Sequence, residues 1–447
     1  MKSHAQIVNC ISWRVMSAKQ WLLDGMAQRQ PGIRLITVLF LGCLTAAHTT
    51  AQAIPSPKAK PSAQSISDAA FSTWINQFRQ DALKQGISTV TFDLAFAGVS
   101  VSQSVLTASE RQPELERRIW TYLNGAVSDH RIKKGREMLA AHRSLLQSVY
   151  ETYGVQPQVI VAIWGLESSF GAATGRTDIV EALTTIAFKG RRKDYARREL
   201  MAVLTILEKG YATRSQLRGS WAGAMGHTQF IPSTYLGFAV DNNQDGRRDL
   251  WGELSDVFAS TANYLAKWNW QRSQSWGREV TLPPDFNYSL ADSRIIKSVK
   301  DWSKLGLKSV APTSLEDDIN QSASLLLPGG HKGPAFLTYQ NFRSILRYNN
   351  STAYALAVSH LADRIAGAKP LQGKWPMSEE PLSKFDRIDM QQRLNRLGYE
   401  PGRVDGIIGA RTRAALRLYQ KDIGVPADGF PTLTVLGRLR QNDGANP

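Results

Sequence analysis

One predicted helix carries a carboxyl group on a face that is otherwise apolar. Four residues recur at helical spacing and therefore share that face: Ile160, Ile163, Trp164 and Glu167. Pro157 suits the first position of this helix and Gly171 suits its end. Apolar neighbours favour the protonated form of Glu167, and so does the negative end of the helix dipole. A carboxylic acid that stays protonated near neutral pH can donate a proton, as cleavage of a glycosidic bond requires. The alternative is a buried glutamate paired with an arginine for structural reasons.

A glycine-rich stretch over residues 219–235 offers a second set of candidate site residues. Its glycines permit a close approach of the backbone to a ligand. Ser220 and Gln229 offer hydrogen bonds, while Trp221 and Phe230 offer apolar surface for sugar rings. A polysaccharide groove needs this mixture of stacking surface and neutral polar groups. A phosphate-binding loop is the competing interpretation, but the stretch has no lysine and matches no nucleotide fingerprint.

A third stretch has the composition of a calcium loop. Four residues match the first half of the pattern D-x-[DN]-x-[DN]-G: Asp241, Asn243, Asp245 and Gly246. Gly252 stands at the twelfth position, where a bidentate glutamate belongs. Glu253 or Asp256 could close the metal site from nearby. The alternative is a turn rich in Asp and Asn that caps a helix.

Composition narrows the class of protein. The chain has 447 residues, which suits two or three domains, and its hydrophobic fraction of 43% is enough for a sizeable core. The net charge of +16 is spread along the chain. A diffuse basic surface suits a polyanionic partner such as nucleic acid, an anionic membrane or the cell wall. The alternative is that the positive charge only keeps the protein soluble.

Cysteine and histidine usage excludes further chemistry. The only cysteines are Cys10 and Cys43. If the segment before residue 54 is removed, disulfides, thiolate catalysis and cysteine metal sites are excluded from the mature chain. The seven histidines show no H-E-x-x-H or paired spacing, which argues against a zinc hydrolase.

The ends of the chain predict export and a separate module. Residues 1–53 have the charged start, apolar run and A-x-A site of a secretory signal peptide, with Met26 as the alternative start. Residues 54–66 form a Pro/Ser/Lys linker. Residues 67–368 read as one mostly α-helical domain with a deep cleft. A second linker, 369–382, contains three prolines and leads to a compact three-helix module at 383–442.

The three stretches together resemble the lytic murein transglycosylases of the membrane-bound type B family. The segments Trp164–Gly171 and 219–235 and the aspartate loop match that family in order and spacing, as do Thr261–Leu265 and Arg347–Asn349. The resemblance implies a lysozyme-like α-helical fold with extra helical lobes. It also implies cleavage of the MurNAc–GlcNAc β-1,4 bond of peptidoglycan without water, which leaves 1,6-anhydroMurNAc ends.

The same resemblance assigns roles to residues. Glu167 would be the sole catalytic acid/base, and four residues would line the site: Ser220, Gln229, Tyr264 and Tyr348. No cofactor would be required for the chemistry. A structural calcium ion would be held by Asp241, Asn243, Asp245, Arg247 (through its carbonyl) and Asp256. Here the chain departs from the family, because one extra residue precedes Asp256 and two arginines add positive charge beside the ion.

The C-terminal module resembles the peptidoglycan-binding type 1 domain, through a Leu-Gly-Tyr segment and a Val-Asp-Gly-x-x-Gly-x-x-Thr-Arg-Ala-Ala-Leu pattern. The expected partner is therefore the glycan strand of peptidoglycan, with other cell-wall enzymes left open and nucleic acid not expected. The expected location is the periplasm.

A hydrolytic muramidase and a non-catalytic wall-binding scaffold remain as alternatives. Hydrolytic glycosidases use two carboxyl groups, and three more acids lie near Glu167 in sequence: Asp178, Glu181 and Asp194. A lone carboxyl group suffices if the MurNAc 6-hydroxyl attacks C1 within the same sugar, because an intramolecular nucleophile has a large effective concentration.

Overall fold

The structure, a computed structural model, describes residues 63–110, 118–311 and 315–444. The predicted signal peptide at 1–53 lies outside these residues, as does the predicted linker at 54–66 up to residue 62. The last four residues of that linker begin the first described helix, α2 (Ala63–Lys84). No helix within the described ranges has the length and apolar character needed to cross a bilayer.

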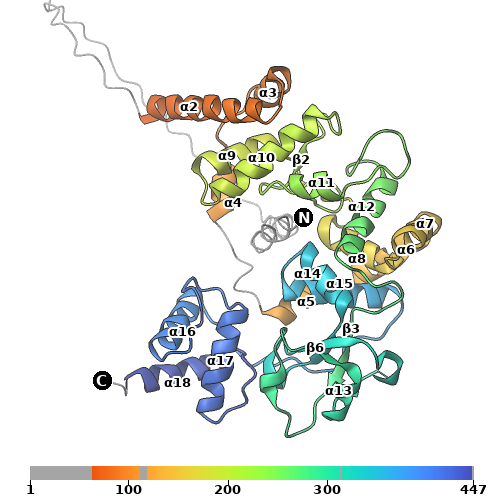
Figure 1. Cartoon of the computed structure of the whole chain (residues 1–447), viewed down its shortest axis with the longest axis vertical. Coiled ribbons are helices and arrows are strands. Elements are labelled where there is room, and N and C mark those ends of the chain that lie inside the picture. The colour runs from red at the N-terminus through yellow and green to blue at the C-terminus, as the bar shows by residue number, and fades with distance from the viewer. Residues whose placement is uncertain (1–62, 111–117, 312–314, 445–447) are drawn as a thin grey trace, which may run out of the picture.

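Helices dominate the catalytic part of the chain, as predicted, and they form two lobes (Figure 1). The N-terminal lobe consists of α2, α3 (Thr89–Phe96), α4 (Gln103–Glu110), α9 (Ile179–Lys189) and α10 (Lys193–Glu208). The central lobe consists of α5 (Ile119–Ala126), α6 (Asp129–Ala141), α7 (Arg143–Tyr153), α8 (Pro157–Ser168), α12 (Leu254–Lys267), α14 (Gln340–Tyr348) and α15 (Thr352–Ile365). The short helix α11 (Pro232–Phe238) packs on α10 and also contacts α12, so it lies between the two lobes.

Helix α8 is the centre of the molecule. Pro157 begins it, and the chain leaves it through Ser169, which has a left-handed backbone with φ +52°. The helix packs against α6, α7, α12 and α15, and nine of its twelve residues are buried. A helix that is apolar around most of its circumference belongs in a core, so the single apolar face predicted from the sequence understates its burial.

A five-stranded antiparallel sheet, with strand order β4-β6-β7-β3-β5, lies between α12 and α14 in the chain. Its elements are β3 (Gly277–Thr281), β4 (Lys297–Ser298), α13 (Val299–Lys304), β5 (Lys308–Ser309), β6 (Ser322–Leu326) and β7 (Ala335–Thr338), with short 3-10 turns at Tyr288–Leu290, Leu315–Asp318 and Gly330–Lys332. In the sequence, the runs 325–327 and 336–339 around a Pro-Gly-Gly turn predict two short strands, and the structure pairs them as β6 and β7 with Leu325 opposite Leu337. The sheet has its own apolar core around the fully buried Trp302.

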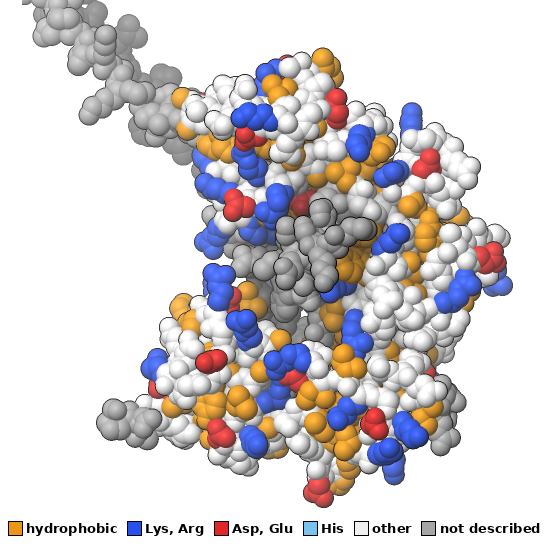
Figure 2. Space-filling model, viewed as in Figure 1, with side chains coloured by type: hydrophobic (Ala, Val, Ile, Leu, Met, Phe, Trp, Pro, Cys, Tyr) orange, Lys and Arg blue, Asp and Glu red, His pale blue; other side chains and the backbone are white. Residues whose placement is uncertain are grey.

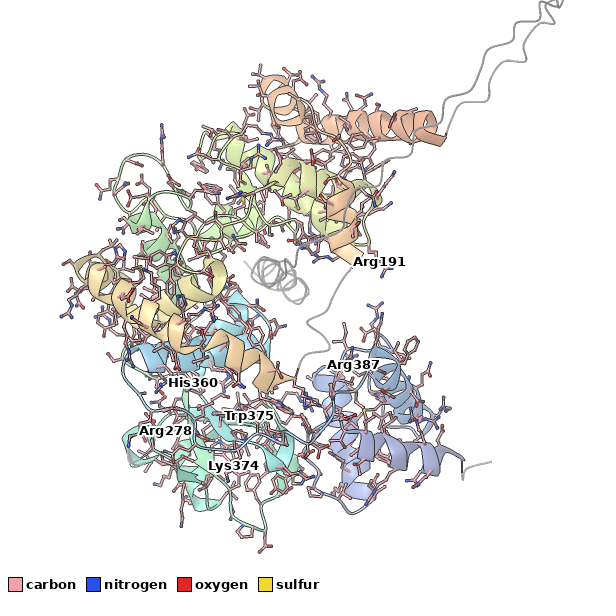
Figure 3. The ribbon with its side chains drawn as sticks, turned by 180° about the vertical axis from the view of Figure 1, so that it is seen from behind. Arg191, Arg278, His360, Lys374, Trp375 and Arg387 are labelled. Carbon is pink, nitrogen blue, oxygen red and sulfur yellow. The ribbon has the colours of Figure 1, made fainter. Side chains whose placement is uncertain are left out.

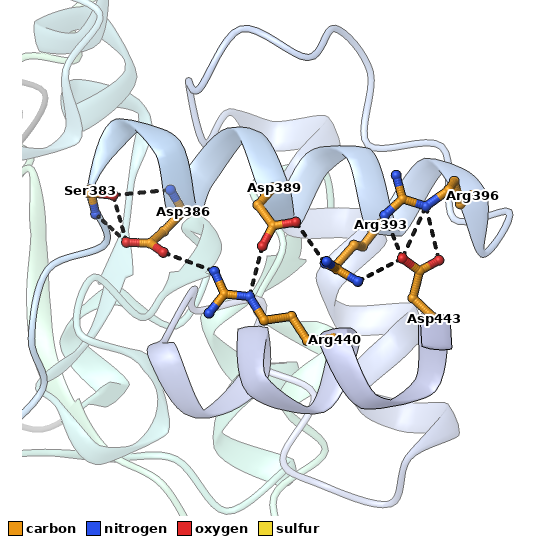
Figure 4. A network of polar contacts seen from close by, with 7 residues as sticks. All are labelled: Ser383, Asp386, Asp389, Arg393, Arg396, Arg440 and Asp443. Carbon is orange, nitrogen blue, oxygen red and sulfur yellow. Dashed lines mark hydrogen bonds and ion pairs between the residues drawn. The ribbon is translucent and has the colours of Figure 1, made fainter. Parts of the chain in front are cut away.

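The C-terminal module contains α16 (Lys384–Arg396), α17 (Ala410–Asp422) and α18 (Leu433–Gly444) around a third apolar core. Ion pairs tie α16 to α18 along one side (Figure 4). Arg440 binds Asp386 and Asp389, and Asp443 accepts from Arg393 and Arg396.

The segment between α15 and the module, predicted as a linker at 369–382, is bound to the catalytic part at residues 372–375. Glu279 of β3 accepts the backbone N–H groups of Gln372 and Gly373, at 2.9 and 2.6 Å. Trp375 packs on Trp120 with ring centroids 5.9 Å apart, and Figure 3 shows it among side chains of the catalytic part. The segment is therefore a strap on the catalytic domain.

Charge is distributed over all lobes, in agreement with the sequence. Figure 2 shows Lys and Arg side chains interspersed with acidic and apolar ones on the face in view.

Candidate active site

Glu167 lies in the last turn of α8 and is only 4% exposed. The hydroxyl of Tyr354, on α15, donates to its Oε1 at 2.7 Å. Tyr354 is itself buried, and burial raises the pKa of its phenol well above the ordinary value, so it stays a neutral donor. Such a donor can bind Glu167 in either protonation state, because a carboxylate oxygen and a carbonyl oxygen both accept.

Two stacked tyrosines connect Glu167 to the glycine-rich stretch. Tyr354 stacks on Tyr348 with an interplanar angle of 6° and a centroid distance of 6.5 Å. The Tyr348 hydroxyl donates to the carbonyl of Thr228 at 2.6 Å. The carboxyl group and the loop, 52 or more residues apart in sequence, are therefore parts of one cluster.

Tyr264, Tyr348 and Phe230 form an aromatic wall beside this connection. The rings of Tyr264 and Tyr348 meet edge to face at 5.1 Å, and each lies 5.9 Å from Phe230. The Tyr264 hydroxyl donates to the carbonyl of Arg347 at 2.6 Å. Burial raises the pKa of both phenols, so both hydroxyls remain donors at neutral pH. The structure thus brings together the two tyrosines that the resemblance implied.

Ser220 and Gln229 stabilise the fold of the glycine-rich loop. The Ser220 hydroxyl accepts the N–H of Ala224 at 3.0 Å, and its own N–H donates to the Ala224 carbonyl at 2.8 Å. Gln229 has a left-handed backbone with φ +56°, and its amide nitrogen donates to the carbonyls of Thr174 and Gly226, both at 2.8 Å. Both side chains are more than 90% buried.

Close backbone contacts explain why glycine occupies position 219. A Cβ there would lie 2.0 Å from the Ala224 carbonyl oxygen. The short strands β1 (Thr177–Asp178) and β2 (Arg218–Gly219) hold the loop from the other side. The loop is thereby held in one conformation by its own backbone.

His227, which the sequence analysis did not single out, fixes the loop against α8. Its Nδ1 accepts from the Trp164 indole N–H at 3.1 Å, and the two rings stack at 5.9 Å. Burial lowers the pKa of the imidazole, which favours the neutral form that can accept at Nδ1. Gly171 leaves room for this ring, since a Cβ there would lie 2.6 Å from it.

The other acids near Glu167 in sequence have separate environments. Asp178 caps α9 by accepting the N–H of Glu181, and it pairs with Arg214 at 2.6 Å. Asp194 is exposed in the first turn of α10. Glu199, buried in α10, accepts the N–H and the hydroxyl of Ser233, both at 2.9 Å, and so caps α11. Asp178 and Glu199 thus have structural partners.

The aspartate loop closes on its own backbone. The carboxylate of Asp241 accepts the N–H groups of Asp245 and Gly246, and Asp256 accepts those of Asn242 and Asp249, at 2.7 and 2.8 Å. Arg247 also donates its N–H to Asp245. Burial, together with repulsion from Asp241, raises the pKa of Asp256. Across the ranges that the structure describes, no three His, Cys, Asp or Glu side chains gather as a metal site would need.

Comparison with known proteins decides the family. The family described as "Transglycosylase SLT domain" matches residues 70–363. The chain belongs to this family. The family described as "Putative peptidoglycan binding domain" matches residues 385–439. The predicted enzyme class is confirmed, and the chain is a peptidoglycan lytic transglycosylase with a lysozyme-like, mainly α-helical fold.

Similar proteins agree with this assignment. Membrane-bound lytic murein transglycosylase B of Escherichia coli K12 is 31% identical over 270 residues, which are 59% of this chain and 72% of that protein. The crystal structure of SltB3 from Pseudomonas aeruginosa in complex with NAG-anhNAM-pentapeptide is 48% identical. It has a TM-score of 0.79 and covers 83% of this chain and 99% of that one. The Escherichia coli lytic transglycosylase Slt35 in complex with calcium is 29% identical, with a TM-score of 0.56, over 66% of this chain and 92% of that one.

Tyr354 is the site residue that sequence reasoning missed. It lies 187 positions from its partner, so no local pattern connects the two. A signal was nonetheless present, because it is the phenol on an otherwise apolar helical face, and a buried tyrosine hydroxyl usually has a hydrogen-bond partner.

Proposed function

We propose that Glu167 is the single acid/base of a water-free cleavage of the MurNAc–GlcNAc β-1,4 bond. Its protonated carboxyl group gives a proton to the glycosidic oxygen, and the bond from that oxygen to C1 breaks. The N-acetyl group of the same sugar stabilises the positive C1. The Glu167 carboxylate then takes the proton of the MurNAc 6-hydroxyl, and that oxygen bonds to C1. The acid is regenerated, and the strand ends in 1,6-anhydroMurNAc.

The observation that supports this proposal is the environment of one carboxyl group. Glu167 is 4% exposed, and its hydrogen-bonding tyrosine is neutral and equally buried. An apolar, nearly dry position favours the protonated acid that the first step needs. Tyr354 holds the carboxyl plane in one orientation and so aims it at the reacting oxygen.

The neighbouring side chains have the character of a glycan groove. Tyr348 stacks on Tyr354, the hydrogen-bond donor to Glu167, and Tyr264 meets Tyr348 edge to face, while Ser220 and Gln229 hold the neighbouring loop. We assign these four residues to substrate binding. Aromatic faces beside neutral polar groups recognise sugar rings without competing for a charge.

Exchange of Glu167 tests the chemistry. Glu167→Gln keeps the shape and the acceptor for Tyr354 but removes the proton, so we expect sacculus digestion to fall by about 10³-fold or more. Mass spectrometry of the parent's products should show anhydro ends. Reducing ends would instead indicate a muramidase that uses water, and undiminished digestion by the variant would remove Glu167 from its role.

We also propose a structural calcium ion at the aspartate loop. The oxygens of Asp241, Asn243, Asp245 and Asp256 and the carbonyl of Arg247 are the ligand types that calcium prefers. A cation there would offset the burial and, to a lesser degree, the repulsion from Asp241 that raise the pKa of Asp256. A calcium complex is known for the Slt35 relative. Calcium at about 100 times its Kd should stabilise the EGTA-treated chain by about 3 kcal/mol. This stabilisation should appear as a rise in the melting temperature of the parent, and Asp256→Asn should abolish the rise. A parent melting temperature that calcium does not change would contradict the proposal.

The remaining assignments concern location and partners. We infer that the chain is exported and acts in the periplasm, since its N-terminal residues have the pattern of a signal peptide and its relatives are murein enzymes. Its partner is the glycan strand, held by the C-terminal module, and other cell-wall enzymes are candidate partners. Fractionation of cells that express the full chain tests the location.

A further inference from the structure

One contact at the active site can change its hydrogen-bonding pattern with pH. The tyrosine hydroxyls around Glu167 stay neutral donors, because burial raises their pKa values. The imidazole of His227 differs, because the ordinary pKa of a histidine is about 6.5. Its Nδ1 accepts the indole N–H of Trp164 at 3.1 Å, and only a ring without a proton on that nitrogen can accept there. A doubly protonated ring would point an N–H group at the indole N–H.

Trp164 connects His227 to the catalytic carboxyl group. It precedes Glu167 by three residues and therefore lies one turn earlier on the same face of α8. Trp164 is 3% exposed, and the rings of Phe170 and Phe258 pack on it with centroids 5.7 and 5.1 Å away. A ring that is close-packed on these sides cannot turn away from His227 without displacing its neighbours or the helix. Repulsion between two N–H groups would thus shift the turn that carries Glu167.

His227 is held in place from its other side by the aspartate loop. Its backbone N–H donates to the Leu250 carbonyl at 2.8 Å. Gly226 permits this approach, because a Cβ there would lie 2.4 Å from the same oxygen. The imidazole also forms a hydrogen bond with the backbone of Trp251. Since the loop fixes both the backbone and the ring, His227 cannot swing away from Trp164 when it takes up a proton.

Three titratable groups surround this contact. The charge of Asp249 and the backbone hydrogen bond raise the pKa of His227, but burial lowers it by more, so the net shift is downward. Glu167 is the ionisable residue of α8. His142 meets the Trp164 ring edge to face, with centroids 5.8 Å apart. The surroundings therefore keep His227 neutral at neutral pH and leave its protonation to acid conditions.

One carboxyl group by itself does not account for a loss of rate in acid. In the mechanism proposed above, Glu167 must be protonated when it meets the glycosidic oxygen. The carboxylate that the second step needs is formed by the proton donation itself. Once the pH is below the pKa of Glu167, the acid is fully protonated and the rate that depends on it becomes constant. A fall in rate at still lower pH must then come from another group.

We propose that His227 is a positioning residue whose neutral imidazole is needed for turnover, and that its protonation ends activity on the acid side of the pH profile. This inference rests on the proposed function, since a single acid/base by itself gives a loss only on the alkaline side. His227 takes up one proton from solvent at Nδ1, and no bond of the substrate changes in that step. It acts through Trp164 on the position of Glu167, and a shift of about 1 Å there costs about a hundredfold in rate.

The pH profile of kcat on a peptide-free glycan, measured from about pH 4 to about pH 8, tests this role. In the parent, kcat should fall about tenfold per pH unit below a midpoint that is itself below about 6.5. His227→Asn keeps an acceptor near the position of Nδ1 but cannot take up a proton. Its kcat should therefore level off in acid, whatever its value at neutral pH. The matched control is His142→Asn, which removes the other imidazole beside Trp164 and should keep the acid loss of the parent.

Nuclear magnetic resonance of the parent with isotope-labelled histidine measures the titration of His227 directly. Its signal is identified as the one that His227→Asn removes. We expect the midpoint of this titration to coincide with the midpoint of the acid loss in kcat. Thermal unfolding at each pH should show that the parent is still folded where its activity falls, as a local shift at Glu167 requires.

Three results would overturn the role of His227. They are a parent kcat that stays constant down to about pH 4, an acid loss that persists in His227→Asn, or midpoints from resonance and kinetics that differ by more than about one pH unit. Glu167→Gln should lose digestion at every pH while His227 still titrates. Reducing ends among the products of the parent would instead contradict the water-free cleavage. Failure of the positioning role and failure of the catalytic proposal therefore give different results.

Discussion

The site around Glu167 and the contact between the C-terminal module and the sheet domain, which we call the seam, are built from different interactions. At the site, tyrosine hydroxyls donate to backbone carbonyls, as Tyr348 does to Thr228 and Tyr264 does to Arg347. At the seam, carboxylates meet arginine and histidine, as Asp292 meets Arg417. Neutral bonds within an apolar core do not respond to pH or salt, whereas charged contacts do. One enzyme therefore contains an aromatic wall that stays rigid as conditions change and a docking contact that conditions can loosen.

A methyl group added to a glycine in each region gives the largest expected contrast. Gly219→Ala places a Cβ 2.0 Å from the Ala224 carbonyl oxygen, so the loop must shift. We expect a loss of about 3 kcal/mol in stability and about a hundredfold in turnover, because catalysis is sensitive to shifts of about 1 Å. Gly330→Ala should instead displace the module, because a Cβ there would lie 2.8 Å from the Asp428 carboxylate, while turnover of a peptide-free glycan persists. Thermal unfolding and turnover of a peptide-free glycan should be measured for both variants. An equal loss of turnover in the two variants would contradict the difference that we expect between the regions.

Removal of one hydroxyl tests the catalytic region more gently. Tyr354→Phe keeps the ring that stacks on Tyr348 but removes the donor to Glu167. The hydrogen bond contributes about 1.5–3 kcal/mol when Glu167 is the carboxylate that forms after proton donation. We therefore expect kcat to fall about tenfold or more, while the melting temperature changes little. An unchanged pH profile of kcat alongside an unchanged rate would show that Tyr354 does not position the acid.

Helix α15 carries Tyr354 near its start and Asp363 near its end, and Asp363 gives a pH test. Burial raises the pKa of Asp363, which accepts from the Trp276 indole at 2.8 Å, to about 6. A raised carboxyl pKa means that folding is favoured at low pH, and that stability falls as pH rises from about 4 through about 6. Asp363→Asn should therefore match the parent at pH 4 and exceed it by about 3 kcal/mol at pH 8, since the shift is about two pK units and each is worth about 1.4 kcal/mol. Urea unfolding at the two pH values measures the difference, and equal stabilities at pH 8 would contradict it.

We expect acid to loosen the seam, and this is the smallest of the effects predicted for the two regions. The pKa values of Asp292 and Asp428 are lowered by their arginine, histidine and amide partners. Their contribution is present above about pH 4, the unfolded value, and is lost as pH falls through the lower folded values. Small-angle scattering should show the module separating below about pH 4, earlier in Asp292→Asn than in the parent. A module that stays docked at pH 2.5 would mean that apolar contacts hold the seam.

Local patterns predicted the helix that bears Glu167 and the loop that borders it, because both are contiguous in sequence. The contacts that complete the site span long separations, as with Tyr354 and Glu167, and no periodicity reports such a pair. Strands of two residues, such as β4 and β5, are too short to show alternation, so most of the sheet was missed. The three prolines after residue 369 suggested a linker, but only the tertiary partner Glu279 reveals a bound strap.

The strap affects the distance along a glycan strand between the point that the module binds and the bond that is cut. Because Glu279 and Trp120 fasten it to the catalytic domain, its contour length does not set the reach of the module. The gap between the point of attachment and the scissile linkage is then a fixed interval, as on a ruler, and inserting residues into the strap should leave the size distribution of released fragments unchanged.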